Sequence, residues 1–168
     1  MKVLKFGGTS VANSGSLNKV LEIIKNQNDS IVVVVSALAG ITDLLMEMLT
    51  LAESRKDNFK SNLSKIEKLH LEPIKKCIPI QNQSAIISYL KKHLNELESR
   101  LDAIFLLEEV TKKNNASVAS YGEILSSNII HEIFKHNKID SELKDARELI
   151  QTSNHNGIEV VNQKITDQ

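Results

Sequence analysis

Two short, largely apolar stretches near the N-terminus are each followed by residues with helical spacing. The stretches are residues 3–6 (VLKF) and residues 31–35 (IVVVV), and the second consists entirely of β-branched residues, as a strand buried on both faces does. Apolar residues recur every three or four positions over residues 17–24 and again over residues 41–52. The order strand, helix, strand, helix predicts an α/β fold with three layers, α/β/α, around a mainly parallel sheet.

The middle of the chain has a helical pattern and no comparable strand. Residues 58–76 are charged and helix-prone, and we expect a break in this helix near Pro73 and Pro79. A second helix is expected over residues 121–136, and residues 141–144 are a candidate strand. A long amphipathic helix is predicted between residues 76 and 121. Its apolar stripe indicates a packing seam in the core or in a dimer: Ile87, Leu90, Leu94, Leu97, Leu101 and Ile104.

Composition narrows the class of protein. With 168 residues, 41% of them hydrophobic and 25% charged, the chain suits one globular domain. The 21 basic residues balance the 21 acidic ones, which indicates neither a nucleic-acid nor a membrane-surface partner. The single cysteine, Cys77, rules out an internal disulfide, and its apolar neighbours favour a buried structural thiol. No signal peptide or membrane span is visible, so a cytoplasmic location is expected.

Three segments carry candidate chemistry: residues 5–10 (KFGGTS), 36–43 (SALAGITD) and 117–127 (SVASYGEILSS). The first two follow strands, and the carboxyl ends of parallel strands are where ligands bind in such sheets. The glycine pair and the helix N-terminus after it suit a phosphate or a carboxylate, although a tight structural turn explains the pair equally well. Lys5, inside an apolar strand, must reach either solvent or an anion, and Ser36 holds the same position on the second strand.

Structural alternatives exist for the other polar residues of these segments. Thr42 or Asp43 can cap the helix that follows them. Glu123 stands three residues after Ser120, in the S-x-x-E spacing of a capping box, so it either caps its own helix or binds a ligand. The five histidines have no metal-ligand spacing, and no metal site is predicted.

The three segments together resemble the aspartate kinases of the amino-acid kinase superfamily. Residues 5–11 (KFGGTSV) are similar to the N-terminal signature of that family, residues 36–43 to its second loop, and residues 120–126 (SYGEILS) to its third. Their order covers the chain from residue 1 to about residue 155. Other members of the superfamily, such as glutamate, uridylate and carbamate kinases, share the Lys-Gly-Gly theme but usually lack the Phe-Gly-Gly-Thr-Ser run.

The resemblance implies transfer of a phosphoryl group from MgATP to the β-carboxylate of L-aspartate, the first step of lysine, threonine and methionine biosynthesis. It implies that Lys5 meets the transferred group as a catalytic residue and that Ser36, Thr42 and Glu123 bind the amino acid, with Glu123 at its α-ammonium. The phosphate-binding segment that it implies is the following set: Lys5, Gly7, Gly8, Thr9 and Ser10. ATP and Mg²⁺ are the implied cosubstrate and metal, and positioning with charge neutralisation is what this chemistry needs.

The resemblance also implies that residues 1–168 are the N-terminal, substrate-binding part of a longer catalytic domain in a homo-oligomer. The nucleotide-binding half and ACT-type regulatory domains would follow, so the 168-residue chain alone is expected to fold but to be inactive. Many members carry an arginine just after the turn at Gly157, whereas this chain has Ile158-Glu159-Val160, which hints at a bifunctional aspartate kinase–homoserine dehydrogenase. The alternatives are another small-molecule kinase of the superfamily, a kinase that binds but no longer transfers, and a non-catalytic helical oligomerisation module.

Overall fold

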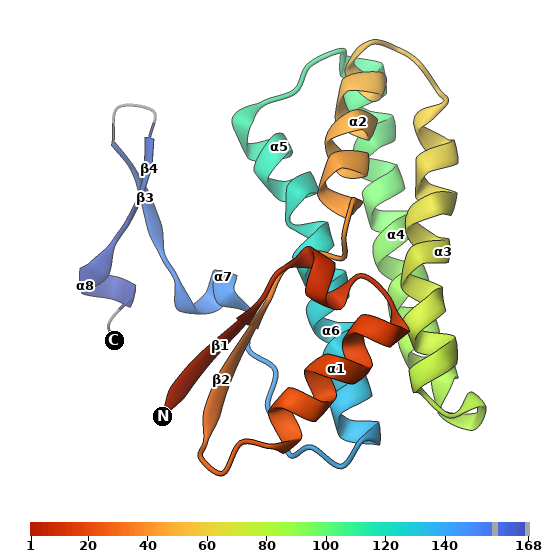
Figure 1. Ribbon diagram of the computed structural model, residues 1–168. Coiled ribbons are helices and arrows are strands. Elements are labelled where there is room, and N and C mark those ends of the chain that lie inside the picture. Colours follow the sequence, from red (N-terminus) through yellow and green to blue (C-terminus); the bar gives the residue numbers. More distant parts are fainter. Residues whose placement is uncertain (156–157, 167–168) are drawn as a thin grey trace.

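The N-terminal part of the chain forms the expected β–α–β–α unit. The computed structural model describes residues 1–155 and 158–166. Strands β1 (Lys2–Phe6) and β2 (Ile31–Val35) lie side by side and parallel, with Lys2 opposite Ile31 and Phe6 opposite Val35 (Figure 1). A 3₁₀ helix, η1 (Gly8–Val11), and α1 (Ser14–Lys25) connect them, and α2 (Ile41–Glu53) follows β2.

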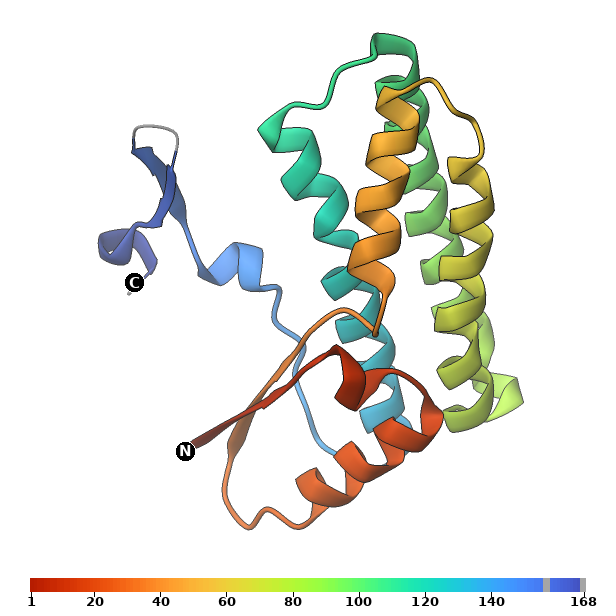
Figure 2. The same cartoon turned by 45° about the horizontal axis from the view of Figure 1, so that its top comes forward.

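A bundle of long helices makes up the middle of the molecule. Figures 1 and 2 show α2, α3 and α4 side by side, with α6 running along the lower part of the bundle below α5. The elements are α3 (Phe59–Cys77), η2 (Ile80–Asn82), α4 (Gln83–Leu107), α5 (Lys112–Ala119) and α6 (Tyr121–His136). Helix α6 has the bounds that the sequence predicted, and α5 was not predicted.

The expected break near Pro73 is wrong. Pro73 is buried inside α3, which continues to Cys77 and ends before Pro79. A proline removes one helical N–H, so the carbonyl four residues earlier loses its donor. Ile66 and Ile74 on the same helix are fully buried, and this packing holds the helix together across the proline.

The C-terminal part lies away from the bundle. It consists of α7 (Ala146–Leu149), an antiparallel pair β3 (Thr152–His155) and β4 (Ile158–Val161), and α8 (Gln163–Thr166). Both ribbon views show this segment standing apart from the helices (Figures 1 and 2). The candidate strand at residues 141–144 is wrong: these residues have no regular structure, and their one apolar side chain, Leu143, is exposed and has no face to bury.

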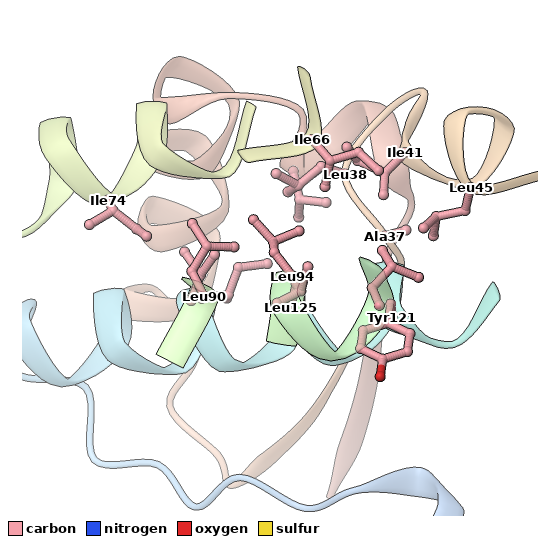
Figure 3. Packing of buried hydrophobic residues seen from close by; sticks show 14 of the residues in the cluster. Ala37, Leu38, Ile41, Leu45, Ile66, Ile74, Leu90, Leu94, Tyr121 and Leu125 are labelled. Carbon is pink, nitrogen blue, oxygen red and sulfur yellow. The ribbon is translucent and has the colours of Figure 1, made fainter. Parts of the chain in front are cut away.

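The apolar stripe of α4 is a core seam of this chain. Side chains of Ile66 and Ile74 from α3, Leu90 and Leu94 from α4, and Leu125 from α6 meet in one buried cluster (Figure 3). The predicted stripe is correct from Leu90 onward, but its first buried member is Ile86, while Ile87 is only half-buried. Helix–helix packing thus supplies most of the core.

The sheet is covered on one side by the described residues. Leu4, Val33 and Val35 pack against the core, whereas Val3, Val32 and Val34 are exposed by 64%, 41% and 43%. The expectation that residues 31–35 are buried on both faces is therefore wrong for this chain. The described residues contain the parallel sheet and one helical layer against it, and no described element covers its other face.

Candidate functional site

The loops after β1 and β2 touch each other directly. The backbone N–H of Ser36 donates to the Phe6 carbonyl over 3.1 Å, which extends the strand pairing by one residue. A side-chain Cβ built on Gly8 would lie only 2.9 Å from the carbonyl oxygen of Ala37. Since real Cβ atoms do not approach backbone oxygens so closely, Gly8 is what allows the two loops to meet. The edge predicted from the strand order is therefore present.

The N-terminus of α6 packs on the same point. A Cβ built on Gly122 would lie 2.7 Å from the Ala37 Cβ, so glycine is also needed here for close approach. The Ser126 hydroxyl, fully buried, donates to the Ser36 carbonyl over 2.8 Å. All three segments singled out in the sequence thus converge on residues Ser36 and Ala37.

Glu123 does not form the capping box. Its Oε1 accepts a hydrogen bond from the backbone N–H of Ala37 over 3.3 Å, across 86 positions of sequence. Ser120 has helical backbone angles and is also the C-cap of α5, and its hydroxyl donates to the Ser117 carbonyl. Because α5 runs almost directly into α6, the backbone N–H of Ser120 already donates to the Ala116 carbonyl. Glu123 is therefore left to face the second loop.

The glycine pair opens a 3₁₀ helix rather than α1. The N–H groups of Gly8 and Thr9 begin η1 and have no acceptor within it, while Ser10 donates back to the Gly7 carbonyl over 2.9 Å. A Cβ on Gly7 would meet nothing within 4 Å, so the space beside it is open. Neither N–H has a hydrogen-bond partner elsewhere in the described part of the chain, and two such donors beside open space are suited to an anion.

The N-terminus of α1 is already occupied by protein groups. Asn13 caps it by accepting from the Ser16 N–H, and Glu72 of α3 accepts from both the N–H and the hydroxyl of Ser14, over 3.0 and 2.7 Å. Burial alone would raise the pKa of Glu72, but hydrogen bonds from Ser14 and from Lys76 hold it below the usual range. The expectation that α1 contributes its dipole to an anion site is therefore wrong.

The remaining candidate residues lie on the strand end and on α2. Lys5 is exposed on the open face of β1, opposite Val34, and forms no ion pair with any residue that the structure describes. Thr42 and Asp43 lie in the first turn of α2 and do not cap it, because the cap is Gly40, in a left-handed conformation with φ of +79°. Thr42 is exposed next to Ile41, whose side chain packs near Gly122.

Three participants were not singled out in the sequence: Ala37, Gly122 and Ser126. The signal for Ser126 is its helical spacing to Ile129, Ile130 and Ile133, which are buried, since a hydroxyl on a buried face needs a partner. Residues 158–160, which stand where the resemblance implies an arginine in many members, begin β4, and Gly157 itself lies outside the described residues. The guanidinium of Arg147 is paired with Asp145, and its Nε donates to Oδ1 of Asp145 over 3.0 Å.

Cys77 and the shallow depressions of the surface contribute nothing to the three loops. The thiol is half-buried, less than the sequence suggested, and burial raises its pKa. One depression lies along α3 around Glu67 and Leu71, and another lies around His131 and Ser141. Within residues 1–155 and 158–166, no three His, Cys, Asp or Glu side chains are placed to hold a metal ion, and no helix is long and apolar enough to cross a membrane.

Comparison with known proteins agrees with this geometry. The amino acid kinase family matches residues 1–167. The chain belongs to the amino acid kinase family. Its fold is that of solved members of this family: aspartokinase III of E. coli superposes with a TM-score of 0.86 at 24% identity, over 99% of this chain and 36% of that one. The aspartate kinase of Clostridium acetobutylicum gives a TM-score of 0.75 at 22% identity.

Curated relatives of this amino acid kinase family member carry aspartokinase names. An aspartokinase of Chlamydia muridarum is 33% identical over 150 residues, which is 89% of this chain and 31% of the relative. Bifunctional aspartokinase/homoserine dehydrogenases of Buchnera aphidicola and Arabidopsis thaliana are 35% and 29% identical, over 80% and 88% of this chain. This chain spans only 17% and 16% of their lengths, so it corresponds to a small part of each.

Proposed function

We propose that this chain is the amino-acid-binding part of an aspartate kinase, which transfers the terminal phosphoryl group of ATP to the β-carboxylate of L-aspartate. The observation that supports this most is the meeting of Gly8 and Glu123 at Ala37, where Gly8 lies against the Ala37 carbonyl and Glu123 accepts from the Ala37 N–H. N–H donors and a carboxylate at one edge suit an amino acid whose ammonium group is bound beside the phosphoryl group that is being transferred to it. E. coli aspartokinase III, which shares the fold, has been solved with aspartate and ADP.

The proposed chemistry needs no proton transfer. An oxygen of the β-carboxylate forms a bond to the terminal phosphorus as the bond from that phosphorus to the ADP oxygen breaks. Lys5 would neutralise the charge on the transferring group, and the N–H groups of Gly8 and Thr9 would orient its oxygens. Glu123 would hold the α-ammonium, while Ser36 and Thr42 would donate hydrogen bonds to the amino acid.

The nucleotide and the metal lie outside this assignment. The described residues offer no group of three metal-binding side chains, so they do not fit Mg²⁺ by themselves, and no step here is derived through it. We place the nucleotide-binding half, and any regulatory or dehydrogenase domain, in the parts of the relatives that this chain does not span. A homo-oligomeric state and a cytoplasmic location belong to the same proposal, and the 168-residue chain is expected to be inactive alone.

Binding of L-aspartate to the 168-residue chain tests the proposal. In ¹H–¹⁵N spectra, L-aspartate is expected to shift the amides of Gly8, Ala37 and Glu123. Succinate, which lacks the ammonium group, and L-glutamate, which is one methylene longer, should bind more weakly. Glu123→Gln should weaken the binding of L-aspartate by about tenfold or more and leave the binding of succinate unchanged. Equal shifts with L-glutamate would favour another kinase of the family, and no shift with any of them would contradict the proposal.

Lys5 is tested with inorganic phosphate as the probe. Lys5→Met should weaken phosphate binding, monitored at the Gly8 and Thr9 amides, whereas Lys2→Met on the same strand should not. Lys2 lies near Asp29, at 3.9 Å, and away from the loops. In any longer protein that contains this chain and has kinase activity, Lys5→Met should lower kcat by about 10²–10³. A loss of tenfold or less would remove Lys5 from the site.

A further inference from the structure

Ser126 is a buried polar residue to which the proposed chemistry gives no role. It lies in the interior of α6 beside Leu125 and one turn before Ile129 and Ile130, and its side chain is fully buried. Its hydroxyl lies 2.8 Å from the Ser36 carbonyl and 3.2 Å from the Glu123 carbonyl of its own helix. A hydroxyl has one proton to donate, so the nearer, long-range acceptor is the main partner.

The bond acts on the same peptide unit as the bond from Glu123. The carbonyl of Ser36 and the N–H of Ala37 belong to one planar trans peptide, in which these two groups point in opposite directions. Ser126 donates to the carbonyl and Glu123 accepts from the N–H, so two side chains of α6 bind the two polar groups of this peptide. Contact between Gly122 and the Ala37 Cβ fixes the distance of the peptide from the helix.

Loss of the Ser126 hydroxyl would free one end of this peptide. The Ser36 carbonyl, which is partly buried, would then be left without its donor, and an unpaired carbonyl there favours rotation of the peptide toward another hydrogen-bond partner. As the plane turns, the Ala37 N–H leaves the Glu123 carboxylate. In the observed arrangement, Oε1 of Glu123 accepts from Ala37, and Oε2 has no hydrogen-bond partner among the residues that the structure describes, so it is available to another donor.

We propose that Ser126 is a positioning residue: through the peptide between Ser36 and Ala37, it orients the Glu123 carboxylate toward the ammonium group of the amino-acid substrate. The substrate part of this inference rests on the proposed function. The coupling of Ser126 to Glu123 does not, and it can be measured without any ligand.

A double-mutant cycle in the 168-residue chain tests the coupling. Glu123→Gln is expected to shift the Ala37 amide resonance and to speed its hydrogen exchange by about tenfold, as loss of a charged acceptor does. In a Ser126→Ala background, Glu123→Gln should have no further effect on Ala37. Ser127→Ala is the matched control, because the one acceptor of the Ser127 hydroxyl among the described residues is the Ile124 carbonyl of its own helix, 3.2 Å away. The response to Glu123→Gln should be kept in this variant.

Two further variants keep the test decisive. Ser126→Thr retains the hydroxyl and should retain the response of Ala37. If Ser126→Ala does not fold, Ser126→Cys replaces it, since a thiol is only a weak donor, and the same loss of response is expected. An unchanged response of Ala37 in the variant that lacks the hydroxyl would overturn the coupling.

Ligand titration then tests the role of the coupling. Ser126→Ala should weaken the binding of L-aspartate by about tenfold and leave the binding of succinate unchanged, because of these two ligands only L-aspartate has the ammonium group. Equal weakening of both ligands, or of neither, would overturn the orienting role. If the unaltered chain binds no L-aspartate, the proposed function fails, and the double-mutant cycle still decides whether Ser126 and Glu123 are coupled.

Discussion

The helical bundle and the two-stranded sheet differ in how completely they are packed. Leu90, Leu97 and Leu101 of α4 are fully buried between helices, whereas Val3 on β1 is 64% exposed and Val34 on β2 is 43% exposed. Burial of apolar surface is the main source of folding free energy. We infer that the bundle provides most of the stability of this chain, while the sheet provides the edge on which the candidate site lies.

Helix α6 belongs to both regions. Leu125 and Ile129 on one face are buried in the bundle, and Glu123 and Ser126 hold the second loop. The loop is therefore fixed by a rigid helix and not by the sheet alone. A site built in this way can keep its geometry even though one face of its sheet is open.

The largest expected effect separates the two regions by stability. Leu97→Ala should lower the free energy of unfolding by about 2–5 kcal/mol, because it leaves a cavity in the bundle. Val34→Ala, on the open face of the sheet, should change it by about 0.5 kcal/mol or less. Urea unfolding followed by circular dichroism measures both. Similar losses for the two variants would show that the open face is covered in solution.

A buried histidine makes the bundle sensitive to acid. His70 on α3 is fully buried, with Nδ1 2.8 Å from the Ile66 carbonyl, and Nε2 has no partner among the described residues. Burial lowers the pKa of His70 from 6.5 to about 4, and the bond to Ile66 opposes this only in part. The unfolded chain therefore binds a proton at a higher pH than the folded chain does.

The contribution of neutral His70 to the free energy of unfolding is fully present above pH 6.5 and is lost as the pH falls toward 4. The difference between the pKa of His70 in the unfolded and in the folded chain corresponds to about 3 kcal/mol in the free energy of unfolding. His70→Met should remove this part of the pH dependence of the free energy of unfolding. His93→Met is the control, since His93 has the same kind of bond to a carbonyl four residues earlier, that of Tyr89, but is only half-buried. Equal flattening by both variants would contradict the assignment to His70.

The sequence predicted best those features that depend on periodicity and on chain order. The parallel pairing, the seam of α4 and the bounds of α6 follow from apolar spacing, which local geometry largely determines. It failed where packing between distant elements decides the outcome. Pro73 stays helical because its neighbours are buried, and residues 31–35 have an open face because no described element packs there.

The candidate site divides in the same way. The three segments were located from their motifs, but the contacts between them could not be predicted from the sequence. Glu123 fits a capping box by spacing alone, and only the approach of Ala37, 86 positions away, gives its carboxylate another partner. Likewise, the carboxylate that satisfies the start of α1 comes from Glu72 on another helix, which no local rule predicts.

The two glycines of the first loop should behave differently at the sheet edge. Gly8→Ala places a Cβ 2.9 Å from a backbone carbonyl, so the loops must separate, and we expect a loss of about 1–3 kcal/mol in the free energy of unfolding. Gly7→Ala meets nothing within 4 Å and should leave stability nearly unchanged while it weakens phosphate binding. Thermal unfolding and phosphate titration distinguish the two. A Gly7→Ala variant that is as unstable as Gly8→Ala would contradict the open space beside Gly7.

The smallest expected effect concerns the link between the bundle and the first loop. Glu72 joins α3 to the start of α1 through Ser14, and Glu72→Gln keeps the shape but removes the charge that these donors favour. Because the carboxylate is partly exposed, solvent screens it, and we expect a loss of about 1 kcal/mol at pH 7. Glu67→Gln on the same helix, where no such bond exists among the described residues, should have no effect.

The pH dependence of this difference tests its cause. Since the folded-state pKa of Glu72 is lowered from 4.5, its contribution is present above that pH and is lost as the pH falls through the folded-state value. The gap in the free energy of unfolding between the unaltered chain and Glu72→Gln should therefore close in acid. The phosphate affinity of Glu72→Gln at pH 7 answers a separate question. If it falls along with stability, then the bundle also holds the glycine loop in place for binding, and the division between a stabilising bundle and a binding sheet edge is less sharp than packing alone suggests.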